Sequence, residues 1–184
     1  MLMAVMRHPG MLMYLDNAQS IGPDSVLGVR SGRGLNENLA RERLELHTVT
    51  PDARYSQTGV TSFAKIITGW SVGRVEVAGE PAGFRFRPMV HEPGEQVLMG
   101  RSFPDGEAGG VAALTFLGTH PATYRHLATK LVRHFIADAP PPSAVNRIAA
   151  ALHDTGGDLG AASRVLVSLP EGWQPLTKLR SPQE

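Results

Sequence analysis

The sequence predicts a mainly α-helical, multi-helix globular domain that spans residues 1–184 and carries a small inserted β-hairpin at about residues 72–90. Three observations support this fold class. Apolar residues recur at helical spacing along most of the chain. Prolines, serines and asparagines stand where helices of this kind begin. Between residues 72 and 90, apolar and polar residues alternate instead, as they do in a strand.

The N-terminal segment predicts a short helix followed by a loop. Pro9 favours the first turn of a helix over "PGMLMYLDNA", because its fixed φ suits that position. The next segment, "SIGPDSVLGVRSGRG" at residues 20–34, is rich in glycine, serine and proline and predicts a loop. Arg30 and Arg33 near its end stand among glycines and are expected to be exposed.

Two longer helices are predicted before the hairpin. Asn36 is an N-cap residue for "ENLARERLELHT", which has the polar density of an ion-pair network or a reactive site. Ser56 is the N-cap residue of the next helix, which is expected to run to Trp70 with an apolar face. Pro51 separates the two helices because it cannot continue the first one.

The hairpin is predicted from two alternating segments, "GRVEVAG" at residues 73–79 and "GFRFRPMV" at residues 83–90. Glycines and a proline lie between them and favour a turn. The segment "EQVLMG" at residues 95–100 predicts either a third short strand or a loop. After Gly106 the pattern becomes helical again.

The C-terminal half predicts four helices. The first covers about residues 106–117, and the second begins after Thr119 or His120 and stops before Pro140. A third helix is expected at about residues 142–153, and Asp158 caps the last one. The predicted core face of the long second helix consists of Tyr124, Leu127, Ala128, Leu131 and Phe135.

Composition excludes several kinds of function. A hydrophobic content of 42% and a charged content of 19% are those of a soluble globular protein. The formal net charge of +1 gives no reason to expect nucleic acid as a partner. The chain has no cysteine, which excludes disulfides, thiolate metal sites and a cysteine nucleophile.

No segment approaches the roughly 18 consecutive apolar residues that a transmembrane helix needs. The opening "MLMAVMRHPGMLMYLD" lacks the charged start, unbroken apolar middle and cleavage site of a signal peptide. Its abrupt apolar beginning suggests a chain that starts inside a larger protein or comes from a shortened gene. The sequence therefore leaves the compartment unknown.

The polar helix after Asn36 contains the first candidate site. Helical spacing places Asn38, Glu42 and Glu45 on one ridge, with the two carboxylates one turn apart. Such a pair can bind a divalent metal or share a proton. Arg41 follows Glu37 at i+4, as in an ion pair. A buried or surface ion-pair network is the alternative explanation, and the sequence favours it.

His91 and Lys130 complete the set of candidate residues. His91 and Glu92 follow the hairpin in a loop and could complete a Zn, Mn or Fe site with Glu42 and Glu45. A loop histidine that is hydrogen-bonded to backbone is the alternative, and it is favoured. On the long helix, Lys130 lies between His126 and His134 on one face, as an anion site would require. A solvent-exposed face is the preferred explanation there.

Four motifs resemble a large bacterial family called domain of unknown function 1800. They are "HPGMLMYLDN", "GLNENLARERLELHT", "TGWSV" and "THPATYRHLATKLVRHFIADAPPP", and they occur in the family's order. The resemblance covers about residues 8–170 and implies the C-terminal part of a longer architecture. Arg43 stands where the family tends to have leucine. The family has no established activity, so the resemblance implies none.

Two hypotheses about function follow. In the first, the chain is a non-catalytic or degenerate helical module, and its apolar residues 1–15 bind a partner or a second copy. In the second, it is a hydrolase-like enzyme. Glu42, Glu45 and His91 would be catalytic, with a divalent metal as an optional cofactor. Asn38, Arg41 and Lys130 would then bind an anionic ligand. The sequence favours the module.

Overall fold

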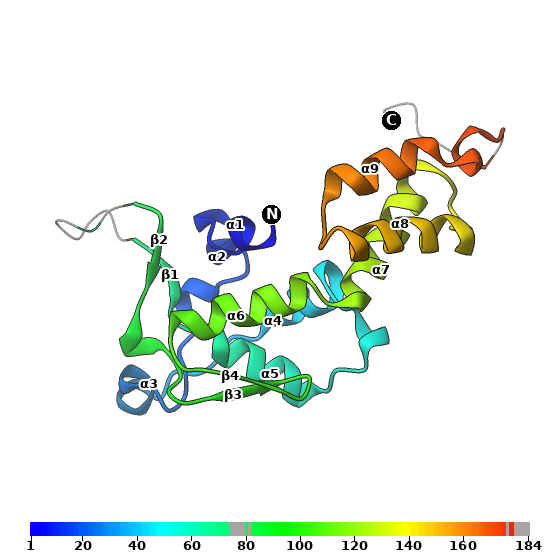
Figure 1. Cartoon of the computed structure of the whole chain (residues 1–184). Coiled ribbons are helices and arrows are strands. Elements are labelled where there is room, and N and C mark those ends of the chain that lie inside the picture. Colours follow the sequence, from blue (N-terminus) through cyan, green and yellow to red (C-terminus); the bar gives the residue numbers. More distant parts are fainter. Residues whose placement is uncertain (74–79, 81, 176, 179–184) are drawn as a thin grey trace. The chain divides into compact units, whose positions relative to one another are not determined.

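The computed structural model describes residues 1–73, 80, 82–175 and 177–178. Within these residues the protein is mainly helical, with two small antiparallel two-stranded sheets, which confirms the predicted fold class (Figure 1). Two compact units are present. The first unit comprises Met1–Leu46 and Arg54–Phe116, and the second comprises His47–Ala53 and Leu117–Glu184. The expectation of a single domain stays a prediction.

The first unit contains short helices that begin at the predicted caps. His8 accepts a hydrogen bond from the backbone N–H of Gly10, and Ser56 accepts one from Gly59. These bonds satisfy amide groups that have no partner inside their helices. The helical segments are α1 (Leu2–Met6), α2 (Pro9–Tyr14), α3 (Val26–Ser31), α4 (Asn38–Glu42), a π-helical turn (Arg43–His47), α5 (Gln57–Ile66) and α6 (Glu107–Gly118).

The prediction of a continuous loop over residues 20–34 is wrong, because α3 (Val26–Ser31) lies within it. The Oγ of Ser25 accepts the N–H of Gly28 at 3.1 Å and caps this helix. A Cβ at Gly28 would lie 2.1 Å from the carbonyl oxygen of Gly22, so the turn before α3 is too tight for a side chain there. Gly28, one of the glycines that suggested a loop, is therefore needed because the backbone at Gly22 packs directly against it.

Two other boundaries differ from the prediction. The helix capped by Ser56 ends at Ile66 instead of Trp70. Ile67 is its C-cap, Gly69 lies in the following turn with a φ of +81°, and Trp70 already belongs to a strand. The polar helix begins at Asn38 because the Oδ1 of Asn36 accepts its backbone N–H at 2.9 Å.

The predicted hairpin is present, and its two strands pair over three residues each. β1 (Trp70–Val72) pairs antiparallel with β2 (Phe84–Phe86). Residues 74–79 lie outside the described residues, so the strand expected at residues 73–79 stays a prediction. For "EQVLMG", where the sequence left a third short strand and a loop open, the structure has a strand, β3 (Gln96–Leu98). Its partner β4 (Arg101–Phe103) was not predicted.

The core of the first unit surrounds Trp70. Its indole is fully buried and meets the ring of Phe84 edge-on at 5.2 Å between centroids. The guanidinium of Arg7 lies 5.5 Å from the same indole and forms an ion pair with Glu107 of α6. The other large buried side chains of this unit include Met6, Leu12, Leu39, Leu44, Phe63, Ile67, Leu98 and Phe103.

The second unit is built from α7 (Pro121–Phe135), α8 (Pro142–Asp154) and α9 (Leu159–Ser168), which pack on one another (Figure 1). His120 and Asp158 cap α7 and α9 as predicted. The predicted core face is partly wrong, since Phe135 is 48% exposed while Val132 and Ile136 are buried. Tyr124 and Ala128 are buried as predicted, and the buried stripe continues four residues on at Val132.

No helix among the described residues is both long enough and apolar enough to span a bilayer. In the apolar N-terminal segment, Met6 and Leu12 are buried whereas Met13 and Tyr14 are exposed. The binding of a partner or a second copy through this segment stays a prediction.

Candidate functional site

The N-terminal end of the polar helix forms a hydrogen-bonded network with α5. The carboxylate of Glu37 pairs with Arg41 at 3.0 Å and accepts hydrogen bonds from Thr61 at 2.6 Å and Gln57 at 2.8 Å. Gln57 also accepts a bond from Arg41. The i, i+4 pair expected from sequence is therefore one edge of a network that ties α4 to α5.

This network sets the protonation of Glu37. The hydrogen bond from Thr61 lowers the pKa of Glu37, burial opposes this, and Gln57 and Arg41 lower it further. A carboxyl group with a depressed pKa in the folded protein stabilises the fold above its unfolded pKa. That stability is lost as the pH falls through the folded pKa.

We expect Glu37→Gln to remove part of this acid-dependent stability. At pH 7 the variant should be less stable than the wild type, and the difference should shrink as the pH falls below the unfolded pKa of Glu37 and through its lower folded pKa, because the carboxyl group is then protonated in both states. Urea unfolding of both proteins between pH 7 and pH 3 measures this difference. Glu95→Gln, a change of an exposed glutamate, is the control. A gap that stays constant over this range would contradict the assignment.

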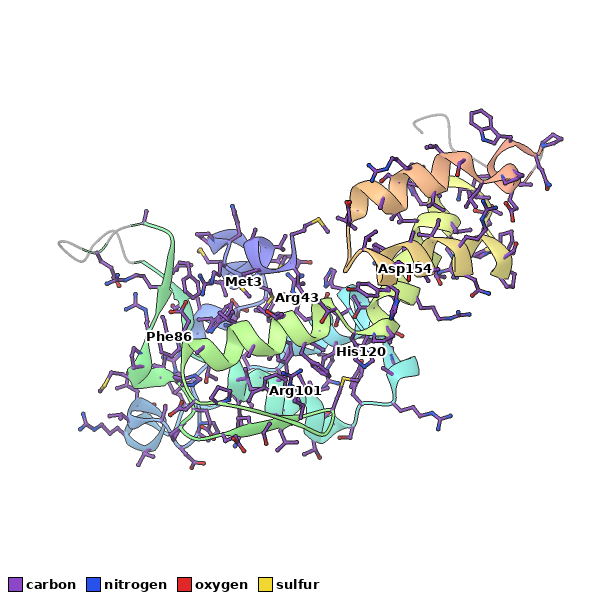
Figure 2. The ribbon with its side chains drawn as sticks, in the orientation of Figure 1. Met3, Arg43, Phe86, Arg101, His120 and Asp154 are labelled. Carbon is purple, nitrogen blue, oxygen red and sulfur yellow. The ribbon has the colours of Figure 1, made fainter. Side chains whose placement is uncertain are left out.

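The structure places the other predicted residues of this helix as follows. Glu42 is half-buried at the end of α4, whereas Asn38, Arg41 and Glu45 are exposed. Glu45 lies in the π-helical turn, whose wider spacing ends the α-helical geometry that predicted a ridge with Glu42. Arg43, labelled in Figure 2, is buried, and burial lowers its pKa below the ordinary value.

The remaining two candidates lie elsewhere. Lys130 is exposed on α7 of the second unit. His91 is buried in the first unit, directly after a 3-10 turn at Pro88–Val90. Across the described part of the chain, no group of three or more histidine, aspartate or glutamate side chains is arranged to hold a metal ion. Glu42, Glu45 and His91 therefore do not form such a group.

His91 is fixed by backbone atoms at both ring nitrogens. Nδ1 lies 2.8 Å from the carbonyl oxygen of Thr68, and Nε2 accepts the backbone N–H of Gly106 at 2.9 Å. Because Nε2 accepts a hydrogen bond, we assign the neutral tautomer with its hydrogen on Nδ1. These are the contacts expected of a loop histidine bonded to backbone. The ring thus joins the end of α5 to the start of α6.

Glu92, the next residue, is a second buried anchor. Its side chain is 2% exposed, and Oε1 pairs with the ammonium of Lys65 at 2.7 Å. Oε2 accepts the backbone N–H of Asp24 at 2.9 Å, and the backbone N–H of Glu92 donates to the hydroxyl of Thr68 at 2.8 Å. These bonds join the loop of Glu92 to α5, to the turn that follows α5 and to the loop before α3.

A pocket of about 340 Å³ opens beside His91. Asp24, Ser25, Phe86, Pro88 and Asp105 contribute to its wall together with His91. Phe86, labelled in Figure 2, comes from the end of β2 and stands edge-on to the imidazole, with 5.1 Å between the centroids. The carboxylate Oδ1 of Asp105 lies 3.0 Å from Nε2 of His91, and its side chain is 57% exposed. The imidazole of His91, the carboxylates of Asp24 and Asp105 and the ring of Phe86 thus line the same pocket.

Sequence reasoning found His91 and Glu92 but missed the residues around them. Asp24 stands in a segment interpreted as a flexible loop, and Asp105 precedes a helix in a "PDGE" turn that gave no signal of its own. Thr68 was counted as part of a longer helix. Only the "HE" pair after the hairpin pointed to this region, because a histidine and an acid in a loop commonly have a role.

The fold and the site define a mainly helical protein whose polar motif residues hold loops against helices. The chain belongs to the family described as "Protein of unknown function (DUF1800)", and the match covers residues 1–184. The resemblance expected from the motifs is therefore confirmed. That description names no activity. No curated protein and no solved structure matched the chain.

Proposed function

We propose that this chain is a non-catalytic helical module in which polar residues of the motifs and the His91–Glu92 pair after the hairpin serve to fix the fold. The observation that carries the proposal is the bonding of His91. Both ring nitrogens are occupied by backbone groups, so the lone pair of Nε2 already accepts a hydrogen bond. A general base needs that lone pair for a proton of the substrate.

The neighbouring polar groups support the same role. Glu92 is buried, paired and hydrogen-bonded, and the amide of Asn17 donates to the carbonyl oxygens of Ile67 and Trp70 at 3.1 and 2.9 Å. Buried hydrogen bonds of this kind rigidify a fold and specify one arrangement of it. For the hydrolase-like alternative, no contact among the described residues joins Glu42 or Glu45 to His91, and no specific observation favours it.

Replacing His91 with alanine tests the proposal. Loss of two buried hydrogen bonds and of the ring's packing is expected to lower the free energy of unfolding by about 2–4 kcal/mol. The measurement is urea unfolding followed by the fluorescence of Trp70, in a Trp173→Phe background. That background leaves one tryptophan, and it lies in the first unit.

His153→Ala is the matched control, because His153 is an exposed histidine of the second unit. It should change stability by less than about 0.5 kcal/mol. A catalytic role for His91 makes the opposite prediction, since removal of a catalytic group leaves stability unchanged or raises it. Equal stability of the wild type and His91→Ala would therefore overturn the structural role.

A further inference from the structure

The pocket beside His91 has features that the structural role of His91 and Glu92 leaves unexplained. We propose that it binds a small organic cation, a primary ammonium attached to an apolar group, between the carboxylates of Asp24 and Asp105. This inference rests on the proposed structural role of His91 and Glu92, because those two residues hold the two aspartates in place.

The loop that carries Asp24 is anchored by Glu92. The backbone N–H of Asp24 itself donates to the buried Oε2 of Glu92 at 2.9 Å. Gly22 packs so closely that a Cβ there would lie 2.6 Å from the Cα of Glu92. The N–H of Gly22 also donates to the carbonyl oxygen of Val90. The position of Asp24 at the pocket wall is therefore set by buried contacts.

The loop that carries Asp105 is anchored by His91. The N–H of Gly106, the residue after Asp105, donates to the buried Nε2 at 2.9 Å. His91 and Glu92 are consecutive, so one buried dipeptide holds two loops that are far apart in sequence. Each loop presents one aspartate to the same pocket. Because both loops are already fixed before a ligand binds, binding costs little conformational entropy.

The charges in the pocket favour a cation. Asp24 and Asp105 are both exposed at its wall, and no lysine or arginine in the described part of the chain lines it. The carboxylate of Asp24 has no hydrogen bond or ion pair with any described residue. Near Asp105, Oδ1 lies 3.0 Å from Nε2 of His91, whose lone pair already accepts the N–H of Gly106, so the carboxylate of Asp105 keeps its acceptor capacity for a donor from a ligand.

The walls favour an organic cation over a metal ion. Phe86, Pro88, Pro93 and Val26 supply apolar surface, and the face of an aromatic ring attracts an ammonium group. The described residues contain no group of three acidic or histidine side chains that could coordinate a metal. A volume of about 340 Å³ is at the small end of ligand pockets, which suits a molecule of the size of benzylamine.

The test is a titration of the full chain, labelled with ¹⁵N, with benzylamine at pH 7.5, where this amine is protonated. We expect saturable shifts of the amide resonances of Ser25 and Gly106, with a Kd on the order of a few millimolar. Benzyl alcohol has the same shape without the charge and should bind at least tenfold more weakly. Benzoate, with the opposite charge, should give no saturable shift.

Two variants locate the site. Asp24→Asn and Asp105→Asn should each weaken benzylamine binding at least fivefold, and the double variant should abolish it. Asp16→Asn is the matched control, because Asp16 is exposed, lies outside the pocket and has a φ of 57° that asparagine accepts. It should bind benzylamine as the wild type does. Unfolding curves of all four variants check that the fold is kept.

Three results would overturn the proposal. They are equal binding of benzyl alcohol, benzylamine shifts that survive both aspartate changes, and the absence of saturation up to about 50 mM, ten times the expected Kd. If Ca²⁺ or Zn²⁺ shifted the same resonances with a lower Kd than benzylamine, the ligand of this pocket would be a metal ion and not an organic cation. Loss of stability in His91→Ala is measured separately, so failure of the ligand proposal is distinguishable from failure of the structural role.

Discussion

Replacing Trp70 with alanine is expected to lower the free energy of unfolding of the first unit by about 3–5 kcal/mol. The indole is 0% exposed and is the largest fully buried side chain among the described residues. It contacts Phe84 edge-on and lies within cation–π distance of Arg7. Removal leaves a cavity beside these groups and beside α6. Urea unfolding followed by circular dichroism measures the change.

A milder pair of variants keeps the test usable if Trp70→Ala does not fold. A Cβ at Gly110 of α6 would lie 2.5 Å from Cζ2 of Trp70, so Gly110→Ala should cost about 1–3 kcal/mol through overpacking. In a Trp70→Phe background the smaller ring makes room, and the cost should fall. Ala108→Gly, at an exposed position of the same helix, controls for helix propensity. Additive costs in the double-mutant cycle would contradict direct contact.

Replacing Lys65 with methionine is expected to lower stability by about 3 kcal/mol, because it leaves the carboxylate of Glu92 buried without its cation. The two groups are 2.7 Å apart, and the Glu92 side chain is 2% exposed. The same urea unfolding assay applies. The matched control is Lys130→Met, a change of an exposed lysine in the second unit.

The double variant Lys65→Met with Glu92→Gln separates two explanations. If the loss comes from an uncompensated charge, the neutral glutamine should restore part of the stability, because it keeps the carbonyl that accepts from Asp24. If the loss comes from the lysine's packing, the second change should add a further cost. A Lys65→Met variant within about 0.5 kcal/mol of the wild type would show that water compensates the carboxylate.

Much of the fold was predictable because the signals are local. Caps such as Ser56, His120 and Asp158 act through the next few amides, and a sequence displays them directly. The short strands β3 and β4 were harder, since the sequence left a strand or a loop open for β3 and did not predict its partner. A strand is stabilised by the residues that it pairs with, and those lie outside a local pattern.

The candidate site was predictable only in part. His91 was found because polar residues in a loop commonly have a role, but its partners Thr68 and Gly106 are separated from it by 23 and 15 residues. The pairing of Glu42 with Glu45 assumed a continuous α-helix, and the π-helical turn from Arg43 to His47 removed that assumption. Such a turn has no simple sequence signature.

The sequence by itself determined the family, the helical class and the starts of its main helices, because caps, prolines and apolar spacing act over a few residues. Only the tertiary structure decided what the polar motifs do. It placed Glu37 in a network with Gln57 and Thr61, and it made the His91–Glu92 pair an anchor for two loops. The physical reason is that a hydrogen bond depends on distance in space, and only folding brings Asp24 and Asp105 to one pocket.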